Sequence, residues 1–135
     1  MKTIKALVIN PGMSANEIEI GSSLKSLQEI VGGYIEVVYP FDDSVAVICN
    51  EEGKIMGLEM NRPIHDEDGV IYDMICGTMI VVGDDEDSGE FVSLTDKQVE
   101  YYTKYYNNIC YQDSETISKY LKDTEGGFVE FKIKL

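Results

Sequence analysis

The pattern of apolar and polar residues predicts strands over much of the chain. Residues 3–9 alternate, residues 34–39 carry the run YIEVVY before Pro40, and residues 44–49 follow a polar turn. Short runs rich in β-branched and aromatic residues between Pro, Asn and Asp are typical of strands, so the last two runs should pair as a hairpin. The continuous apolar run TMIVV at residues 78–82 predicts a central, buried strand. Shorter strands are expected at residues 17–20, 70–72 and 90–93, whereas residues 54–60 fit a strand or a short helix equally well.

Helical spacing first appears after residue 22. Leu24, Leu27 and Val31 recur at intervals of three and four, Ser22 or Ser23 stands where an N-cap is needed, and the Gly32-Gly33 pair follows. This segment predicts a first helix with those three apolar residues facing a sheet.

A second helix is predicted from Thr95 to about residue 107. Thr95 and Gln98 have the spacing of a capping box, and Val99, Tyr102 and Tyr106 lie at helical spacing. We expect Tyr101 and Tyr105 to widen this buried stripe. A third helix at residues 113–122 and a final alternating strand at residues 128–135 complete the expected elements.

These elements predict an α+β fold, mainly an antiparallel sheet of hairpins with two or three helices packed on it. The length of 135 residues fits a single domain, with a core at about residues 3–107 and a helix and strand extension at about residues 108–135. The N-terminus lacks the pattern of a signal peptide, and no apolar run is long enough to span a bilayer. We therefore expect a cytoplasmic protein without a membrane span.

The formal net charge of −14 changes this picture most. Fifteen of the 25 acidic residues lie between residues 36 and 90, against only two basic residues, Lys54 and Arg62. Nucleic acid and anionic membranes are polyanions that such a field repels, so neither is expected as a direct partner. A protein partner, basic or DNA-handling, is favoured instead.

The chain shows no set of residues that predicts a cofactor, a metal or a catalytic centre. Cys49, Cys76 and Cys110 are odd in number and widely spaced, and His65 is the single histidine. The acidic run at residues 84–90 resembles the first half of a calcium loop, but Thr95 stands where the bidentate glutamate is required. A solvated acidic loop is the better interpretation.

Three features are candidates for a protein-binding surface. The first is the acidic loop of Asp84, Asp85, Glu86 and Asp87. The second is the pair Tyr101 and Tyr105, whose alternative role is core packing. The third is Arg62, which could organise a polar site or form a structural ion pair with a nearby carboxylate.

Four segments together resemble a known protein family, described as domain of unknown function 3846. They are LQEIVGGYIEVVYPFDD, ICNEEGKIMGLEMNRPI, DEDGVIYDMICGTMIVVG and FVSLTDKQVEYY, and the resemblance covers roughly residues 3–107. This resemblance does not identify a catalytic residue in the chain. It implies a context, since such proteins resemble the cargo of bacterial mobile elements and phages.

Three hypotheses of function follow. The leading one is a non-enzymatic, protein-binding accessory domain of a mobile element or phage, which uses the acidic turns or the tyrosine-bearing helix. The second is a DNA mimic that inhibits a host restriction or defence nuclease, although its carboxylates cluster in turns at residues 42–43, 51–52, 66–68 and 84–87. The third is a small enzyme whose site is assembled from distant residues.

Overall fold

The computed structural model describes residues 2–109. They form an α+β fold of eight strands and two helices, which confirms the predicted fold class. The elements, in chain order, are β1 (Thr3–Ile9), β2 (Asn16–Gly21), α1 (Leu24–Val31), β3 (Ile35–Val38), β4 (Val45–Asn50), β5 (Met60–His65), β6 (Ile71–Cys76), β7 (Met79–Asp84), β8 (Phe91–Val92) and α2 (Asp96–Asn107). The predicted third helix at residues 113–122 and the final strand at residues 128–135 lie outside the described residues.

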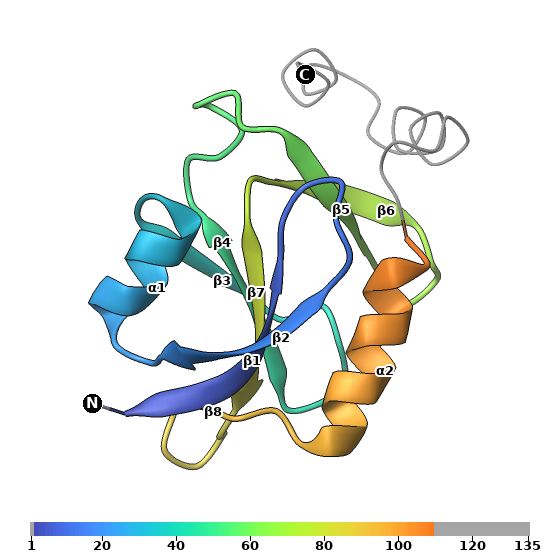
Figure 1. The fold of residues 1–135 in the computed structure, drawn as a ribbon. Helices are drawn as coiled ribbons and strands as arrows, with labels where there is room; N and C mark the ends of the chain where they lie inside the picture. Colours follow the sequence, from blue (N-terminus) through green and yellow to red (C-terminus); the bar gives the residue numbers. More distant parts are fainter. Residues whose placement is uncertain (1, 110–135) are drawn as a thin grey trace.

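The main sheet is antiparallel, with the strand order β2-β1-β7-β4-β3 (Figure 1). The short β8 pairs with the end of β7, and β5 and β6 form a separate two-stranded hairpin. The predicted hairpin of the YIEVVY segment with the next run is confirmed as β3 and β4. The TMIVV segment is confirmed as part of a central strand, because β7 has β1 on one side and β4 on the other.

Both faces of the two central strands are buried. On β4 and β7, Val47 and Val81 contribute to one apolar cluster, whereas Ile48 and Ile80 contribute to another. Successive side chains of a strand point to opposite faces, so a continuous apolar run needs a cover on each side of the sheet.

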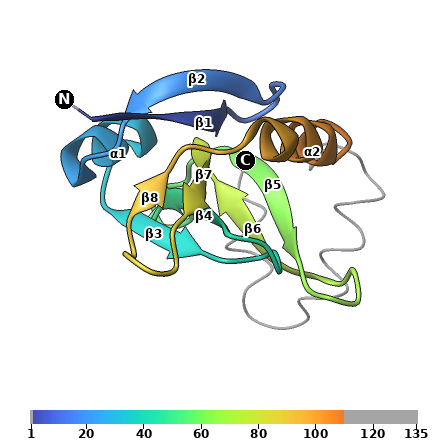
Figure 2. The same ribbon diagram turned by 90° about the horizontal axis from the view of Figure 1, so that it is seen from below.

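The two covers come from different parts of the chain. Helix α1 packs Leu27 and Val31 on one face. Helix α2 packs Tyr102 and Tyr106 on the other face, together with residues of the β5–β6 hairpin (Figure 2).

The residues at which the first helix begins and ends were largely predicted. Ser23 is the N-cap of α1, and Gly32 ends this helix in the left-handed region with a φ of 79°. Leu27 and Val31 are buried as expected. The prediction for Leu24 was wrong, because this first residue of the helix is 58% exposed.

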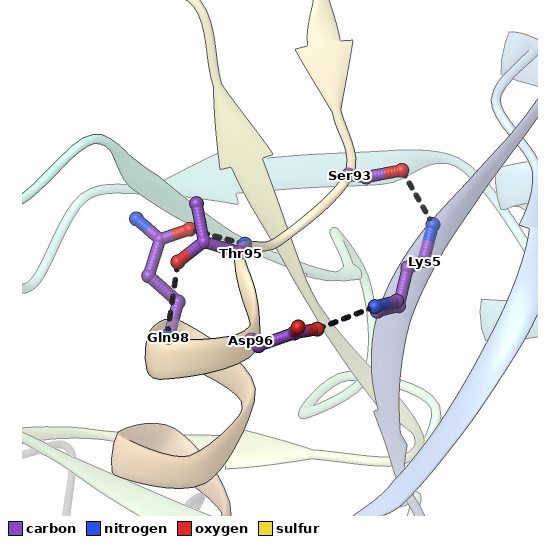
Figure 3. A network of polar contacts seen from close by, with 5 residues as sticks. All are labelled: Lys5, Ser93, Thr95, Asp96 and Gln98. Atoms are coloured by element: carbon purple, nitrogen blue, oxygen red, sulfur yellow. Dashed lines mark hydrogen bonds and ion pairs between the residues drawn. The ribbon is translucent and has the colours of Figure 1, made fainter.

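Helix α2 is tied to β1 at its first turn (Figure 3). The Thr95 hydroxyl accepts a hydrogen bond from the Gln98 N–H at 3.1 Å, and the Gln98 side chain accepts one from the Thr95 N–H at 2.9 Å. This confirms the predicted capping box. The Lys5 ammonium contacts the Asp96 carboxylate at 2.8 Å, which holds the pKa of Lys5 above and that of Asp96 below their ordinary values.

The segment before β6 departs most from the prediction. Residues 54–60 form neither the strand nor the helix considered above, because turns continue through residues 51–57 and β5 begins only at Met60. Strand β5 itself was missed, since Pro63 within MNRPIH argues against a regular strand. Pro63 is accommodated in a two-stranded ladder with an irregular register, as a residue without an N–H requires.

Replacing Thr95 with alanine removes the hydroxyl that accepts the Gln98 N–H bond. We expect Thr95→Ala to lower the free energy of unfolding by about 1 kcal/mol, and Thr95→Ser to stay close to the natural protein because it keeps the acceptor. Urea unfolding followed by circular dichroism measures both. Equal stability of the alanine variant and the natural protein would contradict the proposed role of this cap.

Candidate functional site

The loop of residues 39–44, between β3 and β4, is fixed on helix α2 by aromatic packing. The ring of Phe41 lies 4.7 Å from that of Tyr102 and 5.2 Å from that of Tyr105, measured between centroids. The Tyr105 ring is nearly perpendicular to the Phe41 ring, which is one of the arrangements that aromatic pairs prefer. Phe41 therefore holds the loop against the helix.

A second attachment of this loop is polar. The Tyr102 hydroxyl donates to the Asp43 carboxylate at 2.8 Å, and the Ser44 N–H donates to the same side chain at 2.7 Å. Burial, and then the hydrogen bond and charge of Asp43, raise the pKa of Tyr102. The hydroxyl stays protonated and can act as a donor throughout the neutral range.

A hollow of about 490 Å³ lies between this loop and the tip of the β5–β6 hairpin. The loop contributes Tyr39 to Asp42, and the hairpin contributes the following side chains: His65, Asp66, Glu67 and Tyr72. The Tyr105 hydroxyl lies 3.4 Å from His65 Nδ1, behind this hollow. Partial burial, followed by the negative charges of Asp73 and Asp66, raises the pKa of Tyr72.

A second hollow of about 430 Å³ shares the loop with the first. It is lined by residues of the loop and by two acidic residues, Asp84 at the end of β7 and Glu86 in the connection to β8. Tyr39, Phe41 and Asp42 line both hollows. We call the two hollows together the acidic groove.

The acidic groove gathers three of the four acidic turns seen in the sequence. The described residues that line it include six carboxylates and no lysine or arginine: Asp42, Asp43, Asp66, Glu67, Asp84 and Glu86. The fourth turn, at residues 51–52, follows the opposite end of β4. Six of the 15 acidic residues between residues 36 and 90 therefore lie around one aromatic loop.

The predicted acidic loop lies partly in this groove. Asp84 and Glu86 line the second hollow. Asp85 instead holds its own turn, because its carboxylate accepts from the Asp87 N–H at 3.1 Å and from the Ser88 hydroxyl at 3.0 Å. Asp87 is exposed beside them.

The two predicted tyrosines lie next to the groove rather than in it. Tyr105 is half-buried behind Phe41, and the Tyr101 ring stacks on Tyr105 with centroids 6.5 Å apart. The expectation that Tyr101 widens the buried stripe was wrong, since 60% of this side chain is exposed. It lies on the outward side of α2, one residue before the buried Tyr102.

Arg62 lies in the interior, 5% exposed. Its Nε donates to the Tyr106 carbonyl at 2.9 Å and one terminal nitrogen donates to the Met13 carbonyl at 2.6 Å. A cation at the last turn of a helix is favourable because the carbonyls there carry partial negative charge. Arg62 thus joins β5 to the end of α2 and to the turn after β1, and it is not part of the exposed surface.

Four groove residues were not singled out from the sequence: Tyr39, Phe41, His65 and Tyr72. The acidic turns were visible, but their convergence depends on β5, which the sequence did not predict. The two aromatic residues beside Pro40, Tyr39 and Phe41, were the one local signal that could have pointed to a binding loop.

A separate small cavity lies between β3 and the β5–β6 hairpin. It encloses about 40 Å³ and is lined by Cys49, Glu36, Lys54 and Asp73, among others. Such a volume has room for about two or three water molecules. Burial, then the charges of Glu36 and Asp73, raise the pKa of the Cys49 thiol to about 12, and Lys54 forms an ion pair with Asp73. A protonated thiol beside a paired lysine makes a poor nucleophilic centre.

Within residues 2–109, no group of three or more His, Cys, Asp and Glu side chains is arranged to hold a metal ion. In the same part of the chain, no helix has the length and apolar character needed to cross a bilayer.

Comparison with known families places the groove in context. Residues 4–107 match the family model described as "Domain of unknown function (DUF3846)". The chain belongs to this family. All residues of the acidic groove fall inside the matched part. Comparison with curated proteins and with solved structures found no match.

The hydroxyl of Tyr102 should matter for the stability of the groove loop. Tyr102→Phe removes the donor to Asp43 but keeps the ring packing, so we expect the free energy of unfolding to fall by about 1–2 kcal/mol. Tyr101→Phe is the matched control and should change it by less than about 0.5 kcal/mol, because this side chain is exposed. Urea unfolding measures the stability of both variants. Equal losses in the two variants would contradict a stabilising hydrogen bond from Tyr102 to Asp43.

The thiol of Cys49 should resist alkylation in the folded protein. With its pKa raised from the ordinary 9.0 to about 12, its thiolate fraction at pH 8 should be about 1000-fold lower than that of an ordinary thiol. Iodoacetamide labelling mapped by peptide mass spectrometry should modify Cys49 in urea but not in buffer. As the pH rises, this thiol ionises in the unfolded chain before it does so in the folded protein. The contribution of the protonated thiol to the free energy of unfolding is therefore complete below about pH 9 and is lost towards pH 12. Rapid native labelling would contradict this account.

Proposed function

We propose that this domain is a protein-binding module whose acidic groove holds a basic, extended segment of a partner protein. The observation that carries the proposal is the convergence of three acidic turns around the aromatic loop of residues 39–44. Lysine and arginine side chains combine an apolar stem with a cationic head, which suits a groove that offers both aromatic rings and carboxylates.

The chemistry of the groove supports recognition of cations in two ways. Tyr39 and Tyr72 are 60% and 51% exposed, so their ring faces are accessible to a cationic head. The surrounding carboxylates speed association with a positively charged segment and select against acidic ones. The groove is concave and partly aromatic, whereas a DNA mimic needs carboxylates spaced along an extended face, so a basic peptide fits better.

The setting of this module is also part of the proposal. Cys49 is a free and buried thiol, as is usual for proteins of reducing compartments, which supports the cytoplasm. An accessory role in a phage or mobile element rests on the family resemblance alone. A DNA-handling protein with a lysine-rich segment is one partner of the required chemistry.

Binding of a short lysine-rich peptide to the full chain tests the proposal. Isothermal titration at about 50 mM salt should show binding that weakens strongly at about 500 mM, where exposed charges are screened. A glutamate-rich peptide of equal length should not bind. Absence of lysine-peptide binding at low salt would overturn the proposal.

Charge-matched variants locate the binding site. The triple variant Asp42→Asn, Glu67→Gln, Glu86→Gln neutralises the groove, and we expect the affinity to fall about 10-fold or more. The control Glu17→Gln, Glu19→Gln, Glu29→Gln removes the same charge from β2 and α1, and it should change the affinity less than about threefold. Equal losses would show a response to net charge only and would contradict a defined groove.

A further inference from the structure

Strand β3 is the last strand of the main sheet at the side of β4. Residues Ile35–Val38 pair with β4 and, among the described residues, with no strand on the other side. An unpaired edge of this kind presents backbone donors and acceptors that can take a further strand.

The register shows which backbone groups of β3 face outward. The Glu51 N–H donates to the Tyr34 carbonyl at 2.8 Å, so these two residues form a hydrogen-bonded pair of the ladder. Hydrogen-bonded and non-bonded pairs alternate in antiparallel strands, so Glu36 and Val38 also bond to β4. The backbone groups of Ile35 and Val37 must therefore point away from β4.

The other side of β4 gives the same result independently. The Asp84 N–H donates to the Ser44 carbonyl at 2.9 Å, so Ala46 and Ile48 bond to β7 by the same alternation. The residues between them, Val47 and Cys49, then face β3, where their partners are Val38 and Glu36.

This free edge leads directly into the acidic groove. Strand β3 ends at Val38, and the next residue, Tyr39, lines both hollows. The groove therefore lies at the end of this strand, so a segment bound in the groove has the edge of β3 next to it. Acidic residues accompany it along the way, with Glu36 exposed in the strand and Glu51 at its far end.

We propose that the basic segment continues from the groove as an added strand on β3 and pairs with the backbone of Ile35 and Val37. This inference rests on the proposed function and specifies its partner. Side chains of the added strand alternate between two faces. One face meets Glu36, and the other meets Ile35 and Val37, which pack against the apolar cluster under α1. The partner segment should therefore alternate basic and apolar residues.

Amide hydrogen exchange of the full chain tests this pairing. On saturation with a peptide of alternating lysine and valine, exchange of the Ile35 and Val37 amides should slow by about tenfold or more. The amides of Glu36 and Val38 already bond to β4 and serve as internal controls. A peptide of the same composition with its lysines and valines in separate blocks should bind more weakly.

The outcomes separate this inference from the proposed function. If the alternating peptide binds in the groove but the Ile35 and Val37 amides do not respond, strand addition is wrong and the binding module stands. If the peptide does not bind at low salt, both proposals fall.

Two further outcomes concern other edges and occupants. Slowed exchange at Glu17 and Glu19 instead would place the peptide on β2, the opposite edge of the sheet, and would overturn the assignment to β3. Protection of Ile35 and Val37 in the peptide-free chain would show that another part of the chain, or a second copy, already occupies this edge, and would also overturn it.

Discussion

Burial of β4 and β7 on both faces is the constraint on which the rest of the structure depends. Each residue of β4 from Val45 to Asn50 is buried, and β7 is buried from Met79 to Gly83. One helix cannot cover both apolar faces of a sheet, so the chain has to supply a separate cover for each face. The first face is covered by α1, a short helix of eight residues. The second face is closed by α2 and by the β5–β6 hairpin, which are separated along the chain and must be joined to each other.

Arg62 makes that joint, and the groove is its consequence. Its side chain bonds β5 to the last turn of α2. The neighbouring Asn61 attaches the hairpin to β1 by donating to the Ile9 carbonyl, and it also donates to the Gly77 carbonyl, at 2.8 Å each. Phe41 then packs against the tyrosines of α2, so the loop of residues 39–44 is held between the helix and the hairpin. The hollows on either side of that loop arise because a sheet, a helix and a hairpin meet there without filling the corner.

The parts that local sequence could predict are those determined by local chemistry. Thr95 and Gln98 cap α2 through neighbouring backbone groups, and the continuous apolar run in β7 reports burial on two faces. Strand β5 could not be predicted in this way, because Pro63 opposes a regular ladder and the strand is stabilised by the partners of Asn61 and Arg62, which are distant in the chain. The candidate site could be predicted only as separate acidic turns. Their meeting point depends on the position of the hairpin, which no local pattern encodes.

The roles of the groove carboxylates divide into two groups, and this division argues for a function beyond folding. Asp43 and Asp66 each accept bonds that shape the chain: Asp43 from Tyr102, and Asp66 from the N–H groups of Asp68 and Val70 at 2.9 Å. Among the described residues, the carboxylates of Asp42, Glu67, Asp84 and Glu86 make no hydrogen bond or ion pair, yet they add negative charge next to the first group. Like charges held this close repel one another and oppose folding. These carboxylates, which shape no turn and still increase the repulsion, are the ones whose charge the proposed basic segment would offset.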